Sequence, residues 1–270
     1  MRTRCRMMKA RLTARSGRAR GRMNVETFLA NPRRYFEGAY ELFRSFGGPS
    51  VYFHEQCLQA GAKEFLSERH LELLYATLAS WGMHRMGDPA VTKTRLSDWH
   101  DFCDSIVQQR DCLIEFRNLR MLGLSENGYS ECVAAMKPCY EKLNLSVSNA
   151  SVVVNSKALF HILPDLIPPI DRHYTIRFFT QPPESWRDSD GKFRTLNLPS
   201  NSEGQFSLFQ KICVDMWRLA SQVDPTIFER ECFAHGATVP KALDNAIVNY
   251  VKIVAVPRPE RTRKPKSEGR

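Results

Sequence analysis

The sequence has no long run of apolar residues. No stretch of the 270-residue chain approaches the roughly 18 consecutive apolar residues of a membrane-spanning helix, and the N-terminus has no apolar core of the kind found in secretory signals. Hydrophobic side chains still make up 43% of the chain and aromatic ones 10%, which is enough to build a folded core. We therefore expect a cytoplasmic, globular protein that does not associate with membranes.

The cysteines lack any clustering. They form no Cys-x-x-Cys pair and have no histidine at a metal-ligand spacing, so neither a zinc site nor an iron–sulfur cluster is expected. A chain of this length can bury an ordinary core and needs no disulfide scaffold. The sequence therefore predicts free thiols in a reducing compartment, with no metal and no cofactor. The eight cysteines are Cys5, Cys57, Cys103, Cys112, Cys132, Cys139, Cys213 and Cys232.

Acidic residues are missing from residues 1–22, which hold nine Arg or Lys residues. Residues 258–270 hold six basic and two acidic residues. The whole chain has 39 basic and 29 acidic residues and a net charge of +10, so residues 23–257 keep 24 basic and 27 acidic residues, a net charge of −3. We predict disordered basic tails at 1–22 and 258–270 on either side of one folded domain, 23–257.

The N-terminal tail has three explanations. Its arginines can attract the phosphate backbone of a nucleic acid without sequence preference. The sequence from Met23 onwards is typical of a folded protein, so the true start can also be Met23, with the start of translation assigned 22 residues too early. An arginine-rich leader without acidic residues is equally typical of an organelle transit peptide.

Helical periodicity dominates the chain between the tails. Apolar residues recur every three or four positions, for example in the helix expected after Ser67, which should bury Leu71, Leu74, Leu78 and Trp81 and end at Gly82. A short strand-like run, 152–154, and the turn-rich segment 181–203, expected to form a long loop or hairpin, are the exceptions. The sequence predicts an all-α protein. The expected helix starts are Ser67, Ser97, Ser130, Pro225 and Pro240.

Residues 155–180 differ from the rest of the chain. Asn155 or Ser156 is expected to cap a short helix with Lys157 in its first turn, and Pro164 should end that helix. The apolar segment 166–170, with two consecutive prolines, should then form a stiff connector to the next helix. Proline fixes its own φ and favours an extended backbone at the residue before it.

Asp171 follows the connector at the position of an N-cap, before a helix expected to run to about Phe179. A lysine and a carboxylate are thus expected at neighbouring helix starts with a rigid spacer between them. Asp171 can be only a helix cap, and Lys157 only a solvated cation. Their common position beside a buried apolar connector favours a chemical role, because ionisable groups in such places are often functional.

The stretches Asn155-Ser156-Lys157 and Pro168-Pro169-Ile170-Asp171 resemble the core of the helix-hairpin-helix DNA glycosylase superfamily, particularly its archaeal and bacterial 8-oxoguanine-glycosylase-like branches. The close resemblance covers residues 155–180. It implies a glycosylase-like helical fold in which a hairpin leads into a helix with a lysine near its start, and the catalytic carboxylate lies at the next helix start.

The sequence departs from the family pattern in two ways. Val154-Asn155-Ser156 stands where the family's hairpin has Gly-x-Gly, and Lys157 and Asp171 are 14 positions apart, which is short for the family. No cysteine-rich iron–sulfur loop follows, so the endonuclease III-like branch fits poorly.

The resemblance implies cleavage of an N-glycosidic bond in DNA. The sugar then gains oxocarbenium character, and a carboxylate close to the anomeric carbon stabilises that charge and can orient water. Asp171 is expected in this role. Lys157, as a neutral amine, could instead attack the anomeric carbon and form a Schiff base, which would add AP-lyase activity.

An enzyme of this kind must flip its target base out of the duplex into a pocket. The tract from Trp81 to Arg85 is the candidate for one wall of that pocket, and His161 could line it because it lies four residues after Lys157. Arg172 could contact phosphate or the Asp171 carboxylate. The resemblance assigns Asn155 and Ser156 to the hairpin that binds DNA.

Three hypotheses follow. The first is a monomeric DNA glycosylase that excises a damaged or modified base from double-stranded DNA, in repair or in defence against phage with modified bases. The second is a non-catalytic nucleic-acid-binding protein on the same scaffold, with the tails supplying affinity. The third is a helical protein–protein module in which Asp171 only caps its helix.

Overall fold

The computed structural model describes residues 23–45, 49–83, 95–147 and 151–255. The predicted disordered tails lie outside these ranges, as does Arg85. Across the described ranges, no helix combines the length and the apolar character required to cross a bilayer.

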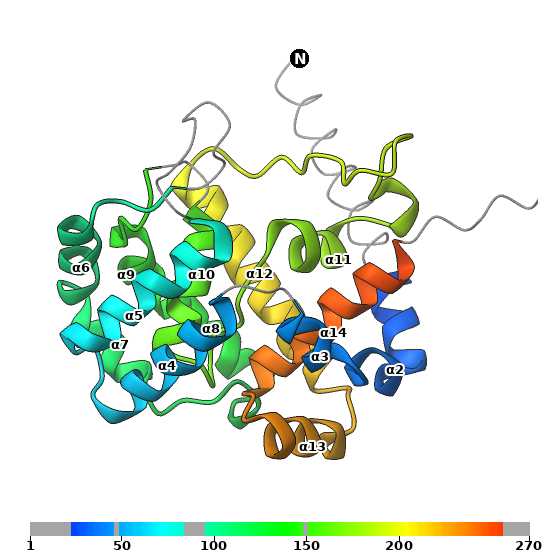
Figure 1. The fold of residues 1–270 in the computed structure, drawn as a ribbon, viewed down its shortest axis with the longest axis horizontal. Coiled ribbons are helices and arrows are strands. Elements are labelled where there is room, and N and C mark those ends of the chain that lie inside the picture. Colours follow the sequence, from blue (N-terminus) through cyan, green and yellow to red (C-terminus); the bar gives the residue numbers. More distant parts are fainter. Residues whose placement is uncertain (1–22, 46–48, 84–94, 148–150, 256–270) are drawn as a thin grey trace, which may run out of the picture.

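The described residues form helices and loops, and no strand occurs among them, so the predicted all-α class is confirmed (Figure 1). Residues 23–30 are helical and precede the labelled helices. The segment 181–203 is mostly irregular, with one isolated bridge between Arg187 and Phe193. The labelled helices are α2 (Pro32–Phe36), α3 (Ala39–Arg44), α4 (Ser50–Lys63), α5 (Glu68–Leu78), α6 (Trp99–Val107), α7 (Arg110–Phe116), α8 (Glu126–Ala135), α9 (Lys137–Lys142), α10 (Ser151–Ile162), α11 (Arg177–Thr180), α12 (Ser202–Ala220), α13 (Pro225–His235) and α14 (Val239–Val254). Shorter turns are η1 (Ala79–Met83), η2 (Met121–Gly123), η3 (Arg172–Ile176) and η4 (Pro183–Ser185).

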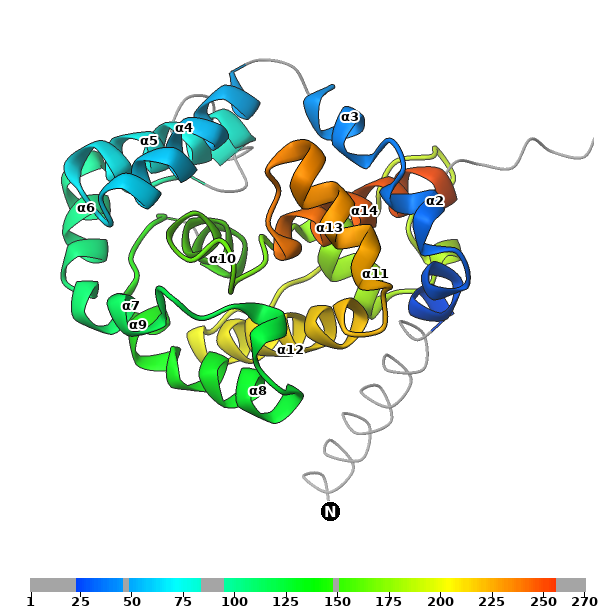
Figure 2. The same ribbon diagram turned by 90° about the horizontal axis from the view of Figure 1, so that it is seen from below.

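Helix α10 is the centre of the fold. It lies between α4 and α5 on one side and α12 on the other, as the view along its axis in Figure 2 shows. Every residue from Val152 to Ile162 is buried. A helix that is buried all round needs no amphipathic pattern, and this explains why the run Val152–Val154 suggested a strand. That prediction is wrong, because burial in the core outweighs the β-propensity of valine.

The pair α4 and α5 pack closely because of one glycine. A Cβ added at Gly61 would lie 2.7 Å from a ring carbon of His70, which is shorter than any ordinary contact. The His70 ring of α5 fills this space and lies directly against the Gly61 backbone of α4.

The C-terminal helix α14 packs against the N-terminal residues of the described chain. Phe28 lies between Tyr35, Phe178 and Tyr250, with ring centroids 5.2 to 6.0 Å apart. The Asn24 side-chain amide donates to the Phe178 carbonyl at 2.7 Å. Residues distant in sequence are thereby fixed around α11 and α14.

Several predicted helix starts are confirmed. Ser67 caps α5 by accepting the His70 backbone N–H, and Pro225 and Pro240 lie in the first turns of α13 and α14. Gly82 has a φ of +86°, which glycine adopts readily, and it lies in η1 just after α5.

Two predicted starts are wrong. Asp98, not Ser97, caps α6, and the Ser97 hydroxyl instead donates to the Asn144 carbonyl. Ser125, not Ser130, caps α8. In the first case the Ser97 hydroxyl is engaged by a residue distant in sequence, and in the second case Ser130 lies inside α8.

Candidate active site

Asp171 is the N-cap of η3, as predicted. Its backbone is extended (φ −111°, ψ 142°), and its Oδ1 accepts the His173 backbone N–H at 2.7 Å. The Asp171 backbone N–H donates to the Thr175 hydroxyl at 3.2 Å. These bonds fix both the backbone and the carboxylate.

Lys157 lies in the middle of α10, and its predicted place in a first turn is wrong. The helix has already begun by Ser151, so Asn155 and Ser156 are internal residues and do not cap it. The valine run that precedes them is buried and helical, which extends α10 beyond the expected start. Lys157 still reaches Asp171, with 3.0 Å between Nζ and Oδ2.

Ser156 holds the apolar connector against α10. Its hydroxyl oxygen accepts the Ile170 backbone N–H at 3.1 Å, immediately before Asp171. This bond places the Asp171 carboxylate opposite the next residue of the helix, Lys157. Asn155 is also buried and donates from its side chain to the Tyr140 carbonyl. Neither Asn155 nor Ser156 lines the cavity described below.

The environment of Asp171 favours its charged form. Burial alone would raise the pKa of the carboxyl group, but the Lys157 ammonium and the His173 N–H together lower that pKa below its usual value. The carboxylate therefore stays ionised at neutral pH. Its side chain keeps an exposed fraction of 27%, compared with 11% for Lys157, so the pair is open to solvent on one side.

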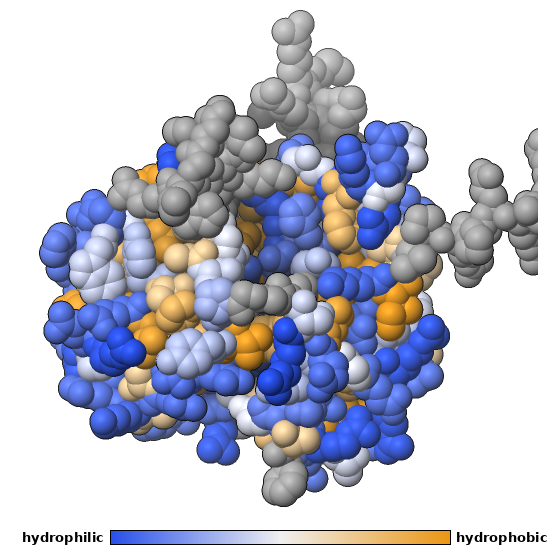
Figure 3. All heavy atoms as spheres, in the orientation of Figure 1, coloured by the Kyte–Doolittle hydropathy of each residue, from blue (hydrophilic) through white to orange (hydrophobic). Residues whose placement is uncertain are grey.

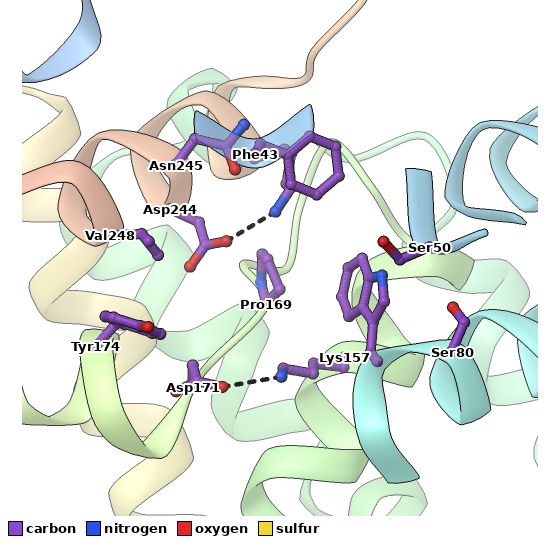
Figure 4. A pocket seen from close by; sticks show the side chains of 12 residues that line it. Phe43, Ser50, Ser80, Lys157, Pro169, Asp171, Tyr174, Asp244, Asn245 and Val248 are labelled. Carbon is purple, nitrogen blue, oxygen red and sulfur yellow. Dashed lines mark hydrogen bonds and ion pairs between the residues drawn. The ribbon is translucent and has the colours of Figure 1, made fainter. Parts of the chain in front are cut away.

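The Lys157–Asp171 pair faces a cavity of about 290 Å³ (Figure 4). The molecule is hollowed near the middle of the face shown in Figure 3. The cavity is lined by residues of α3, α4, η1, α10, η3 and α14, which lie far apart in the sequence. These residues are Phe43, Ser50, Ser80, Trp81, Lys157, Pro169, Asp171, Tyr174, Lys241, Asp244, Asn245 and Val248.

Trp81 lines this cavity, as the sequence suggested. It lies in η1, where the chain leaves helical geometry at Trp81 and Gly82. The Lys157 Nζ is 5.5 Å from the centre of the indole ring, so the tryptophan and the ion pair form adjoining parts of one site.

A second lysine–aspartate pair lines the same cavity and was not predicted. Lys241 Nζ and Asp244 Oδ2 are 2.9 Å apart on α14, with side-chain exposed fractions of only 7% and 8%. The Thr175 hydroxyl donates to Asp244 Oδ1 at 3.3 Å. The sequence signal was two opposite charges three positions apart in an otherwise strongly apolar helix.

Thr175 therefore connects the two pairs. Its hydroxyl oxygen accepts the Asp171 N–H, and its hydroxyl hydrogen is donated to Asp244. This single side chain therefore hydrogen-bonds to both aspartate residues.

His161 does not line the cavity, although the sequence made it a candidate. It is buried behind Lys157, where its Nδ1 lies 2.7 Å from the Lys157 carbonyl oxygen and its Nε2 lies 3.0 Å from His54 Nδ1. Because a carbonyl only accepts, the His161 Nδ1 carries the proton, and His54 donates from Nδ1 to the bare His161 Nε2.

A third histidine completes this network. His70 Nδ1 accepts the Leu66 N–H at 3.2 Å, so its Nε2 carries the proton and lies 3.3 Å from the His161 carbonyl oxygen. Burial lowers the pKa of His70 to about 4 and that of His161 to about 3. Burial also lowers the pKa of His54. All three are neutral and support the backbone from which Lys157 projects.

The remaining candidates are less informative. Arg172 is the first residue of η3 and is not among the residues that line the cavity. Among the described parts of the chain, no group of three or more His, Cys, Asp or Glu residues could hold a metal ion.

Comparison with known proteins finds no matching family model, no matching curated protein and no matching solved structure. The chemistry of the cavity residues is therefore the main guide to function. In chemical terms, these residues provide two carboxylates, two amines, aromatic ring faces and a side-chain amide around one partly enclosed space.

Proposed function

We propose that this protein is a DNA glycosylase that excises a damaged or modified base from duplex DNA. The observation that carries the proposal is the Lys157–Asp171 pair, 3.0 Å apart at one end of a cavity that also has aromatic and polar walls. The resemblance of residues 155–180 to the helix-hairpin-helix DNA glycosylase superfamily supports it. A glycosylase-like arrangement of the helices is part of the same proposal.

Asp171 would act on the sugar. As the N–C1′ bond lengthens, positive charge develops on the anomeric carbon, and an ionised carboxylate beside it lowers the energy of that state. The carboxylate oxygen that does not cap η3 is the one bonded to Lys157. An entering nucleotide would exchange part of that bond for contact with the sugar, while the cap bond keeps the carboxylate in place.

Lys157 would help to hold the carboxylate. A lysine side chain ordinarily carries a proton at neutral pH, and a protonated amine cannot attack carbon. The ion pair therefore favours attack by water on the sugar, which gives base release without strand cleavage. Schiff-base chemistry would require Lys157 to lose its proton after the substrate enters.

The decisive experiment measures base release from a panel of duplexes, each with one modified base, for the wild type and Asp171→Asn. We expect release from at least one duplex and a loss of at least about 100-fold in the variant, the magnitude typical of one missing electrostatic contact. Asp165→Asn is the matched control, because Asp165 is exposed on the same segment and does not line the cavity.

Two outcomes would refute the proposal. One is a wild-type protein that releases no base from any duplex of the panel. The other is an Asp171→Asn variant as active as Asp165→Asn, which would reduce Asp171 to a helix cap.

A further inference from the structure

The geometry points to a recognition surface for the base: we propose that Lys241, Asp244 and Asn245 bind the hydrogen-bonding edge of the flipped base. We further propose that this surface selects a neutral base and excludes cationic, N-alkylated bases. The inference rests on the proposed glycosylase function and names its substrate class.

The position of these residues supports this role. In Figure 4, Lys157 and Asp171 lie on one side of Pro169, and Asp244 and Asn245 lie on the other. Lys241 donates to Asp244 from the same helix. A nucleotide whose sugar approaches Asp171 would extend its base across the cavity, towards α14.

The hydrogen-bonding capacity of the surface is only partly used. Asp244 accepts from Lys241 on one oxygen and from Thr175 on the other, and each carboxylate oxygen can accept a further bond. The Asn245 side chain lines the cavity, is 6% exposed and has no side-chain hydrogen bond to another described residue. Buried polar groups normally form hydrogen bonds. Because the described residues offer the Asn245 amide none, it can form its hydrogen bonds with a ligand.

The combination of groups matches the edge of a base. Lys241 can donate, Asp244 can accept, and the Asn245 amide can do both. The edges of nucleobases present donors and acceptors side by side. A ligand without such an edge would leave these buried groups unpaired, which is how polar pockets reject an analogue.

Charge excludes a cationic base. The Lys241 Nζ lies 4.3 Å from the centre of the Phe43 ring and 5.3 Å from that of Trp81, so the ring faces that would attract a cationic base already face an ammonium group. Both aspartates of the cavity are likewise paired with a lysine. The cavity thus has no excess negative charge to stabilise a cationic base, and desolvation would strengthen its repulsion from the two ammonium groups.

The test compares duplexes with neutral modified bases (uracil, hypoxanthine, 8-oxoguanine and 5-hydroxymethyluracil) and a duplex with cationic 7-methylguanine. We expect kcat/KM for the best neutral base to exceed that for 7-methylguanine by at least about 100-fold. In Lys241→Met this ratio should fall at least about tenfold, because the variant removes the ammonium group that repels a cationic base. A purely structural role would lower both rates equally and leave the ratio unchanged.

The outcomes separate this inference from the function on which it rests. Release of 7-methylguanine as fast as of any neutral base, or an unchanged ratio in Lys241→Met, would overturn the inference and leave the glycosylase proposal intact. Release from no duplex at all would overturn the glycosylase proposal and the inference with it. If Lys241→Met fails to fold, Lys241→Gln gives the same comparison, because it removes the positive charge and keeps a donor towards Asp244.

Discussion

The two lysine–aspartate pairs of the cavity are built differently. Lys157 and Asp171 come from two elements joined by the proline-containing connector, and the Asp171 side chain is 27% exposed. Lys241 and Asp244 are three residues apart on one helix, with exposed fractions of 7% and 8%. An open pair between elements can be separated by a ligand at small cost, whereas breaking a buried pair leaves an uncompensated charge in the core. This difference is the reason why we propose chemistry for the first pair and recognition for the second.

Activity separates the pairs most strongly. Asp171→Asn should lower base release by at least about 100-fold, while its free energy of unfolding should change by less than about 1 kcal/mol because asparagine is also a good N-cap. Single-turnover kinetics and denaturant unfolding of the same preparation measure both quantities. A loss of activity that merely follows a loss of stability would contradict a chemical role.

The free energy of unfolding should depend more on the Lys241–Asp244 pair than on the Lys157–Asp171 pair. Asp244→Asn leaves Lys241 buried without its counter-charge, so the free energy of unfolding should fall by about 3 kcal/mol or more. Base release, measured below the unfolding transition, should fall about tenfold or less, because Asp171 is unchanged. If Asp244→Asn were more damaging to catalysis than Asp171→Asn, the division between the pairs would be wrong.

Substitution of Thr175 would break the hydrogen bonds that connect the two lysine–aspartate pairs, while all four charged residues remain. Thr175→Val keeps the shape of the side chain but leaves the Asp171 N–H and Asp244 Oδ1 without this partner, which should cost about 1 to 3 kcal/mol of stability. The matched control is Thr180→Val on α11, where the hydroxyl donates only to the Ile176 carbonyl of its own segment. The double-mutant cycle of Thr175→Val with Asp244→Ala should be non-additive, because each substitution removes the hydrogen bond from the Thr175 hydroxyl to Asp244 Oδ1. Additive effects would disprove the coupling.

Local rules in the sequence predicted part of this arrangement. The two prolines and the following Asp171 were enough to place a rigid connector before an N-cap, and the break at Gly82 placed Trp81 at the end of a helix. Such features depend on residues adjacent in the chain.

The features that the sequence did not predict depend on long-range packing. The start of α10 was placed too late because its valines are helical only through burial between α4, α5 and α12. Lys241 and Asp244 were not predicted as part of the site, since nothing in α14 itself shows that Phe43 and Trp81 lie against Lys241. The histidine network joins three elements and has no local signal.

As the pH falls, the buried histidine network behind Lys157 should be destabilised before the Lys157–Asp171 pair is affected. The buried histidines have pKa values of about 4 (His70) and about 3 (His161), below the 6.5 of an unfolded histidine. Between pH 6.5 and about 4, these histidines bind more protons in the unfolded chain than in the folded one. Their contribution to the free energy of unfolding is therefore fully present above pH 6.5 and is lost as the pH falls. Each histidine should contribute about 1.4 kcal/mol per pH unit in the steep part of this range. The lowered pKa of Asp171 acts only below about pH 4, where an unfolded aspartate begins to bind protons.

Chemical unfolding at pH 7, 6 and 5 measures this slope directly. His161→Asn, which keeps a donor towards the Lys157 carbonyl, should reduce the slope by about one histidine's share, roughly 1.4 kcal/mol per pH unit. His100→Gln, at an exposed histidine of α6, is the control and should leave it unchanged. A stability profile that is flat from pH 7 to 5 in the wild type would mean that the three histidines do not stay neutral in the folded protein. The tautomers that link them to the backbone of Lys157 would then be wrong.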